Sequence, residues 1–346
     1  MCSLAPVSRV TPLLSILIAM FAHVQDLRAD EPTHYPSIGS IERNHPDFDR
    51  LVPRAAKLEK LATGFEWSEG PVWMKKGNYL LFSDIPNNAV MKWHQGQGIS
   101  RFLKPAGYTG GAPRGGESGS NGLLVDRQGR LVLCQHGDRR VARLEKNGKF
   151  TTLADRYKGK RLNSPNDGVF RSNGDLYFTD PPYGLEKLND DPAKELDFCG
   201  VYHLTPDNKL TLLTKEMTYP NGITLSPDEK TLYVAQSDPD HAIWKAFALT
   251  PDGTLAAGRV LFDATAWVRE GRKGLPDGMK VDQQGNLFAT GPGGIHVFSP
   301  AGVHLGSIDP GEATANCNWG DDGSTLYITS DMNLCRIRLT TKGKGF

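Results

Sequence analysis

The sequence has no excess of charge of either sign, because its 346 residues contain 40 lysines and arginines and 39 aspartates and glutamates. A balanced chain provides no overall field to attract nucleic acid or an anionic surface. It also lacks a basic run interleaved with aromatic residues, which nucleic-acid-binding proteins commonly show. We therefore expect no nucleic-acid partner.

Long apolar stretches with helical periodicity are also missing, and cysteine is scarce. Five cysteines are present, of which Cys134, Cys199, Cys317 and Cys335 lie beyond the N-terminal segment. No Cys-x-x-Cys pair indicates a zinc site, and four cysteines in so long a chain do not form a disulfide framework. One or two disulfides and buried free thiols both remain open as predictions.

Residues 1–29 have the pattern of a secretory signal peptide. Arg9 provides the positive start, residues 11–24 are apolar, and the small residue Ala29 offers a cleavage point. The apolar run is short for a membrane span, so we expect no stable membrane insertion. An uncleaved interfacial anchor is the alternative. The pattern predicts a secreted or periplasmic protein.

A short sequence pattern recurs six times after residue 68. Each copy begins with an oxygen-bearing side chain and continues with an apolar run, a polar turn and a second apolar run. The intervals between the first residues of successive copies are 52, 45, 55, 56 and 39 residues. These first residues, here named the lead residues, are Glu69, Asn121, Asn166, Asn221, Asp277 and Asn316.

The repeat predicts an all-β protein. Each copy contains two clear strands, and most continue with a third and a weaker fourth, which is typical of four-stranded antiparallel β-propeller blades around a central channel. We predict a six-bladed β-propeller over residues 57–346, preceded by a leader segment, residues 30–56. The last copy lacks a fourth strand, so a strand near residues 57–62 is expected to complete that blade. Residues 48–52 also alternate like a strand.

The lead residues are expected to converge on one mouth of the channel, because the first strand of a blade is the innermost. Two carboxylates and four carboxamides would form an oxygen-rich ring suited to a hard cation. Asn-Gly and Asp-Gly are also turn dipeptides, but each copy already has its hairpin turn further on. Simple capping of the strands does not explain two acids. Calcium is favoured on ligand chemistry, with magnesium, manganese and zinc as alternatives.

Several motifs resemble the gluconolactonase, or senescence-marker-protein/regucalcin, family of six-bladed propellers. Four of them lie one per copy, and two further stretches resemble its bacterial gluconolactonase branch. The four are Ser-Glu-Gly-Pro-Val-Trp at 68–73, Pro-Asn-Asp-Gly at 165–168, Pro-Asn-Gly-Ile at 220–223 and Leu-Pro-Asp-Gly-Met at 275–279. The two stretches are residues 134–141 and 179–184.

The resemblance implies a metal-dependent lactonase. It implies that Glu69, Asn221 and Asp277 hold one divalent cation and that Asn166 is a fourth ligand or a substrate contact. The family's mammalian members carry an arginine two residues before the position of Asn166. Here that residue is Ser164, so sugar recognition by that arginine cannot be transferred. Arg139, Arg140 or Arg161 are candidate replacements.

A mechanism follows from this arrangement. The cation would polarise a lactone carbonyl, and the attacking water would be activated by Asp277 as the catalytic base or by the cation itself. Asn121 and Asn166 would hydrogen-bond substrate hydroxyls. His136 could contact the substrate or simply be satisfied within its loop, and Tyr183 could form a wall of the pocket.

Three classes of function fit this pattern. The favoured one is hydrolysis of a small-molecule sugar lactone to the aldonic acid. The same site could act on other lactones or on phosphotriesters, and a propeller that only binds a ligand is the third class. The glycine-rich residues 107–120 are expected to form a loop near the channel mouth, and the chain is expected to be a monomer or a weak dimer.

Overall fold

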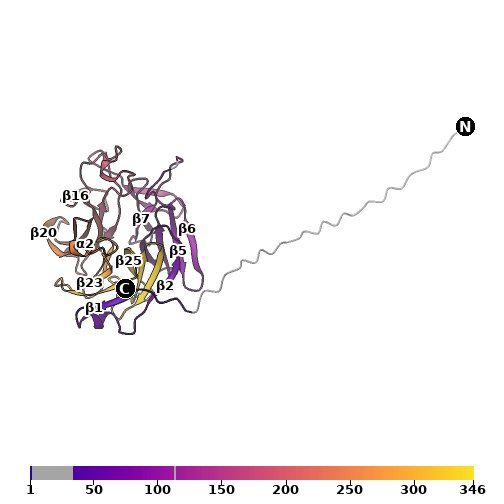
Figure 1. Cartoon of the computed structure of the whole chain (residues 1–346). Helices are drawn as coiled ribbons and strands as arrows, with labels where there is room; N and C mark the ends of the chain where they lie inside the picture. The colour runs from indigo at the N-terminus through magenta and orange to yellow at the C-terminus, as the bar shows by residue number, and fades with distance from the viewer. Residues whose placement is uncertain (2–33, 113) are drawn as a thin grey trace. The chain divides into compact units, whose positions relative to one another are not determined.

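The computed structural model describes residue 1 and residues 34–112 and 114–346. The predicted signal peptide therefore lies outside the described residues. Within those residues, no helix has both the length and the apolarity needed to cross a membrane. The regular secondary structure from residue 34 onward consists almost entirely of β-strands (Figure 1).

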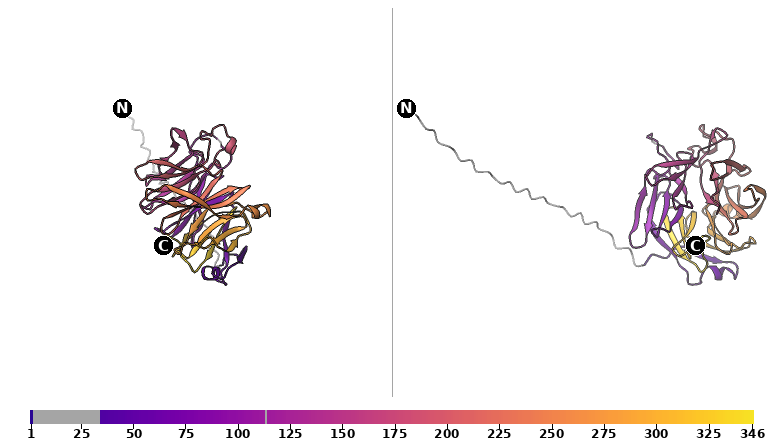
Figure 2. Two further views of the ribbon diagram at one scale, coloured as in Figure 1. Left: turned by 90° about the vertical axis from the view of Figure 1, so that its left-hand side faces the viewer. Right: turned by 180° about the vertical axis from the view of Figure 1, so that it is seen from behind.

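Six antiparallel sheets follow one another along the chain, which confirms the predicted six-bladed propeller (Figure 2). The first blade contains β3 (Ser68–Met74), β4 (Tyr79–Asp84), β5 (Ala89–His94) and β6 (Gly98–Leu103). The second contains β7 (Ser120–Val125), β8 (Leu131–Gln135), β9 (Arg140–Leu144) and β10 (Phe150–Ala154). The third contains β13 (Gly168–Phe170), β14 (Leu176–Asp180), β15 (Gly200–Leu204) and β16 (Leu210–Thr214).

The remaining blades follow the same order. The fourth contains β17 (Pro220–Leu225), β18 (Thr231–Asp238), β19 (His241–Leu249) and β20 (Leu255–Asp263). The fifth contains β21 (Met279–Val281), β22 (Leu287–Gly291), β23 (Gly294–Phe298) and β24 (His304–Asp309). The sixth contains β25 (Thr314–Gly320), β26 (Thr325–Ser330) and β27 (Asn333–Arg338). Short elements lie in the connections: β11 (Arg156–Tyr157), β12 (Lys160–Arg161), η1 (Leu188–Asp190) and α2 (Thr265–Arg269).

The second strand of each blade is apolar on both faces because neighbouring blades cover both. In β4, Leu80 and Phe82 pack in a cluster with Tyr327 of the sixth blade, whereas Leu81 between them packs with Leu123 of the second blade. Side chains alternate between the two faces of a strand. A continuous apolar run in a strand is therefore what packing between two blades requires.

The ring closes through a strand from the N-terminal side of the chain. The strand β2 (Leu58–Thr63) pairs antiparallel with β27 and forms the fourth strand of the sixth blade, so that indigo and yellow segments meet there in Figure 1. Glu59 of β2 and Arg336 of β27 form an ion pair of 2.7 Å. The innermost strands contact one another in cyclic order, from β3 through to β25 and back to β3.

The segment before β2 has more structure than a plain leader. The strand β1 (Ser40–Arg43) pairs with β24 and gives the fifth blade a fifth strand, which the sequence analysis did not predict. Residues 48–52 do not form the predicted strand, because Phe48–Leu51 is a short helix, α1. Its Phe48 and Leu51 are three residues apart and are both buried in a cluster between the fifth and sixth blades. That spacing places both side chains on one helical face, and this burial outweighs the local alternation.

Cys134, Cys199, Cys317 and Cys335 are all buried and unpaired. Of the two readings that the sequence left open, the structure thus has free thiols. Burial raises the pKa of each of these thiols. The thiolate, which is the reactive form of cysteine, is therefore disfavoured at all four positions.

Candidate active site

The lead residues lie where the innermost strands begin, and irregular backbone presents their side chains. In four blades the pairing between the first and second strands shifts register at or next to the lead residue. In the other two, Asn166 and Asp277 lie two residues before the strand begins. A bulge inserts an unpaired residue and redirects its side chain. The four shifts occur between Glu69 and Val72, Ser120 and Leu123, Pro220 and Ile223, and Thr314 and Asn316.

The glycine after a lead residue allows adjacent blades to approach closely. A Cβ atom on Gly222 would lie 2.1 Å from the backbone oxygen of Asp277 in the next blade, and one on Gly70 would lie 2.2 Å from that of Asn121. Both distances are far below any real contact. The glycine is therefore required by backbone packing around the channel, which explains the recurring dipeptide without a hairpin turn.

Hydroxyl groups of the second strands also hold the backbone of the next blade. Each donates a hydrogen bond to a carbonyl oxygen at or next to the neighbouring lead residue. The bonds are Ser83 to Asn121 at 2.8 Å, Thr179 to Asn221 at 2.7 Å and Thr290 to Ala315 at 2.9 Å. These buried bonds fix the positions of the lead residues relative to one another.

Five of the six lead residues line one cavity of about 480 Å³. They are Glu69, Asn121, Asn166, Asn221 and Asp277. The predicted convergence of these residues is thus present, and the volume lies within the usual range for small-molecule sites, about 300–1,000 Å³. Tyr183 and Ser237 contribute further polar atoms to the lining.

Four oxygen atoms in this cavity are buried without a hydrogen-bond partner in the described part of the chain. They are the Oδ1 atoms of Asn121, Asn166, Asn221 and Asp277. A buried acceptor that makes no hydrogen bond costs about 1–3 kcal/mol. Four such oxygens from four blades in one cavity form an arrangement that a ligand rich in positive charge would satisfy. Oxygen-only donors of this kind suit a hard divalent cation.

The orientation of the Asn221 side chain follows from its hydrogen bonds. Its Nδ2 donates to Ser237 Oγ at 2.9 Å, and Ser237 Oγ donates to the Pro276 carbonyl at 2.5 Å. Because the single hydroxyl proton of Ser237 is used on that carbonyl, the hydroxyl can only accept from Asn221. The amide nitrogen must therefore face Ser237, and Oδ1 must be the atom left unpartnered.

Burial raises the pKa of two carboxyl groups that line the cavity, those of Glu69 and Asp277. For Glu69 the largest cause is desolvation, followed by repulsion from Asp167. For Asp277 desolvation is followed by repulsion from Glu69. No group of three or more His, Cys, Asp or Glu residues with the arrangement of a metal site occurs among the described residues. A cation in this cavity would thus depend on the amide oxygens as well as on the two acids.

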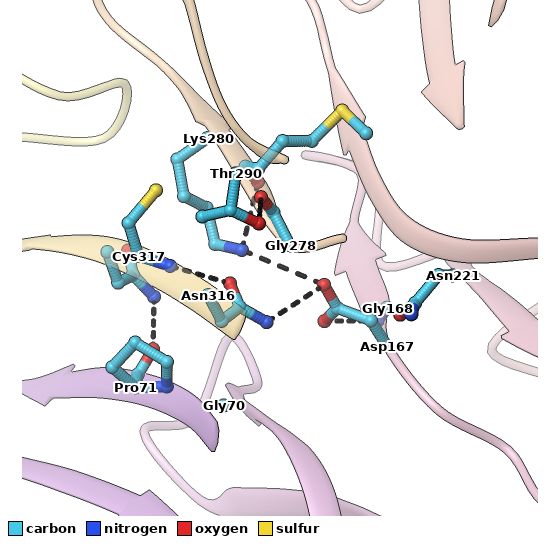
Figure 3. Close-up of polar contacts among 12 residues, drawn as sticks. Gly70, Pro71, Asp167, Gly168, Asn221, Gly278, Lys280, Thr290, Asn316 and Cys317 are labelled. Carbon is cyan, nitrogen blue, oxygen red and sulfur yellow. Dashed lines mark hydrogen bonds and ion pairs between the residues drawn. The ribbon is translucent and has the colours of Figure 1, made fainter. Parts of the chain in front are cut away.

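The sixth lead residue, Asn316, lies deeper in the channel. Its Nδ2 donates to Glu69 Oε2 at 3.1 Å and to Asp167 Oδ2 at 3.4 Å, as Figure 3 shows for Asp167. Lys280 Nζ lies 4.0 Å from the same Asp167 oxygen. Asn316 therefore holds the Glu69 carboxyl group by a hydrogen bond and does not line the cavity.

His136 lies behind Asn166 and is fully buried. Its Nε2 is 3.5 Å from Asn166 Nδ2, and its Nδ1 is 3.1 Å from Glu117 Oε2, although that approach lacks hydrogen-bond geometry. Glu117 itself lines the cavity, and sequence reasoning missed it. The only sequence feature that could have indicated Glu117 is that it is the single acidic residue in the glycine-rich residues 107–120.

The glycine-rich stretch is tied to connections of the second and third blades beside the cavity. Arg114 donates to the carbonyl oxygens of Gly137, at 2.7 Å, and of Gly184. Next to Gly184, Tyr183 lines the cavity and stacks on Tyr219 with ring centroids 5.9 Å apart.

The three arginines considered as replacements at the position of Ser164 do not line the cavity. Arg139 and Arg161 donate to backbone carbonyls, and Arg140 donates to the side chains of Gln135, Thr152 and Asp138. Ser164 instead donates to the Pro181 carbonyl at 2.6 Å.

The fold and this cavity define a six-bladed propeller with an acid-and-amide site where its innermost strands begin. The chain belongs to the SMP-30/gluconolactonase family, because the model described as "SMP-30/Gluconolactonase/LRE-like region" matches residues 67–332. The resemblance drawn from the sequence motifs is thereby confirmed. Several relatives are named gluconolactonase or lactonase, which are hydrolases of lactones.

Named relatives cover most of the chain. A gluconolactonase of Zymomonas mobilis is 42% identical over 314 residues, which are 89% of this chain and 88% of the relative. Regucalcin of Gallus gallus is 26% identical over 272 residues, 77% of this chain and 83% of the relative. The solved structure of XC5397 from Xanthomonas campestris, described as a gluconolactonase, is 33% identical with a TM-score of 0.78, and the match covers 90% of this chain and 99% of that one.

Proposed function

We propose that this protein is a divalent-metal-dependent lactonase that opens a sugar lactone to the aldonic acid. The observation that carries the proposal is the group of four unpartnered buried oxygens in one cavity beside the Glu69 carboxylate. Relatives named gluconolactonase support the substrate class, and one of them matches nearly the whole folded chain.

The residues that would hold the cation are Glu69, Asn166, Asn221 and Asp277. Their oxygen donors favour calcium, with magnesium, manganese or zinc as alternatives to be tested. When bound, the cation polarises the lactone carbonyl and stabilises the negative charge that develops on its oxygen. Positive charge at this position would also offset the desolvation and mutual repulsion that raise the pKa of Glu69 and of Asp277.

Asp277 is proposed to act as the general base. Its carboxylate accepts a proton from a water molecule as the water oxygen adds to the carbonyl carbon. The bond between that carbon and the ring oxygen then breaks, and the ring oxygen takes up the proton to give the hydroxy acid. Asn121 is proposed to hydrogen-bond a substrate hydroxyl, and Tyr183 to form a side wall.

His136 is proposed to act through Asn166, because it is buried behind that residue. It would hold the Asn166 amide nitrogen and so keep Oδ1 directed at the cavity. His136 is thus proposed to position Asn166 and not to contact the substrate directly.

Turnover of glucono-1,5-lactone tests the proposal. Acid release is followed in the mature chain after chelation and after each divalent cation is added back. We expect activity to return with calcium or another hard cation and Asp277→Asn to lower kcat by about 10²–10⁴-fold. Asp207→Asn is the matched control, because Asp207 is an exposed acid outside the cavity. Activity that is unaffected by chelation and by Asp277→Asn would contradict the mechanism.

Export of the protein is a separate proposal that rests on residues 1–29. N-terminal sequencing of chain recovered outside the cytoplasm is expected to start close to residue 30. Recovery of chain that still begins at Met1 would contradict cleavage.

A further inference from the structure

The cavity lining combines a polar part and an apolar part. The polar part includes the five lead residues at the starts of the innermost strands, together with Glu117, Tyr183 and Ser237. Another part of the lining, here named the apolar wall, comes from the connections of the first, fourth, fifth and sixth blades. The apolar wall consists of Trp67, Pro239, Val268, Leu275 and Ala313.

The apolar wall is not part of the hydrophobic core. Trp67, Val268 and Leu275 are each partly exposed, and Pro239 is exposed, whereas core side chains of this fold are buried. Covering apolar surface with a ligand removes it from water, which lowers the free energy of the complex. A cavity with several large apolar side chains and a few converging polar groups is typical of a site for a partly apolar small molecule.

Two local features make the apolar wall rigid. Val268 lies on α2, which is anchored by Trp267, whose ring is 4.8 Å from that of Phe262 and 4.5 Å from that of His296. Leu275 directly precedes Pro276, which restricts its backbone to an extended conformation. The apolar side chains are therefore held in place before a ligand arrives, which lowers the entropy cost of binding.

The charge of the lining disfavours negatively charged substrates. Glu69, Glu117 and Asp277 are acids, and no lysine, arginine or histidine occurs among the described residues that line the cavity. Even with one divalent cation, the three carboxylates leave a negative balance when ionised. A lactone that carries a phosphate or carboxylate group would meet no counter-charge from the protein and would lose its hydration.

We propose that the preferred substrate is an uncharged lactone with an apolar alkyl or aryl substituent, which lies on the apolar wall while the lactone ring faces the acids and amides. This inference rests on the proposed lactonase function and goes beyond its sugar-lactone substrate: the site would open a sugar lactone but would turn over a lactone with an apolar substituent more efficiently. A bare polyhydroxylated ring would satisfy the polar lining but would leave Trp67, Val268 and Leu275 uncovered.

A matched pair of substrates tests the apolar wall. δ-Valerolactone and δ-decalactone have the same ring and differ by a pentyl chain. We expect kcat/KM of the full mature chain to be at least about tenfold higher for δ-decalactone, because each methylene placed in an apolar site adds to the discrimination. Val268→Thr combined with Leu275→Asn is expected to reduce this ratio towards one. The control Val303→Thr, at an exposed valine outside the cavity, is expected to leave the ratio unchanged.

A second pair tests the charge of the lining. We expect kcat/KM for the phosphate ester of glucono-1,5-lactone to be at least about tenfold below that for the uncharged lactone. A ratio of one or less for the first pair in the wild-type chain would overturn the inference and leave the lactonase proposal standing, and so would equal turnover of the second pair. Failure to hydrolyse any of the four lactones with any cation would contradict the lactonase proposal itself, and this inference with it.

Discussion

Two regions of the channel use equivalent residues in different ways. At the cavity, Asn221 occupies a lead position, and its Oδ1 has no hydrogen-bond partner within residues 34–112 and 114–346. In the channel interior, Asn316 occupies the same position of the sixth repeat but has both ends of its amide bonded. Its Oδ1 accepts from the Cys317 backbone at 2.9 Å, and its Nδ2 donates to Glu69 and Asp167. The repeat thus fixes the backbone, while neighbouring groups decide whether an oxygen is offered to a ligand.

Removal of the interior amide is expected to have the largest effect on stability. Asn316→Ala leaves Glu69 and Asp167 without a shared buried donor and should lower the free energy of unfolding by about 3 kcal/mol. Chemical denaturation of the metal-free protein measures this change. An unchanged free energy of unfolding would show that the interior hydrogen bonds have no structural role and would remove the contrast between the two asparagines.

The same substitution at the cavity is expected to act on the ligand. Asn221→Ala removes an oxygen that has no hydrogen-bond partner among the described residues, so its main effect should be at least about a tenfold loss of calcium affinity, or about 1.4 kcal/mol. Calorimetric titration of the chelated protein measures the affinity, with Asn318→Ala as a control at an asparagine that lines no part of this cavity. Equal affinities of Asn221→Ala and wild type would contradict the assignment of Asn221 as a ligand.

Asp180 is a buried acid outside both regions, and it makes the stability of the protein depend on pH. Burial raises the pKa of Asp180 from 3.8 to about 7. Between these values the folded chain binds a proton that the unfolded chain has released, so the contribution of Asp180 to stability is fully present below about pH 4 and is lost as the pH rises towards 7. The slope from this group is at most about 1.4 kcal/mol per pH unit.

Asp180→Asn is expected to flatten that part of the stability profile, because the amide cannot ionise and still accepts from the Asn163 backbone. Denaturant titrations at several pH values provide the measurement. A slope identical to that of the wild type would show that Asp180 is ionised in the folded chain.

Loss of a single hydroxyl contact between blades is expected to have the smallest effect. Thr179→Val removes the donor to the Asn221 carbonyl and should cost about 1 kcal/mol of stability. Thr211→Val is a control at a threonine of an outer strand, away from the channel. If both variants are equally stable, the hydroxyl bonds between blades are not what positions the lead residues.

Much of the fold could be predicted from the sequence because the repeat is regular. The period of about 50 residues and the paired apolar runs indicate blades without any long-range information. The strand β1 and the helix α1 could not be predicted, since both depend on the partner surface that they cover. Local alternation at residues 48–52 fits a strand, but packing of Phe48 and Leu51 between two blades selects a helix.

The candidate site was predictable to the extent that it uses the repeat. Five lead residues reach the cavity as the innermost position requires. Glu117 and the apolar wall could not be located, because they lie on connections whose paths are set by tertiary contacts such as those of Arg114. Ser237 lies near the end of β18, and its place in the cavity follows from its hydrogen bonds with Asn221 and Pro276 in the folded ring. The different environment of Asn316 could not be predicted from the sequence either, since Asp167 approaches it only in the folded ring.

Calcium binding to the chelated mature chain tests the central claim most directly. Calorimetric titration is run on the wild type and on Asp277→Asn under the same conditions. The account predicts one calcium ion per chain in the wild type and at least about tenfold weaker binding in the variant, with a matching loss of lactone turnover. Absence of binding by any divalent cation in a correctly folded wild-type chain would contradict it.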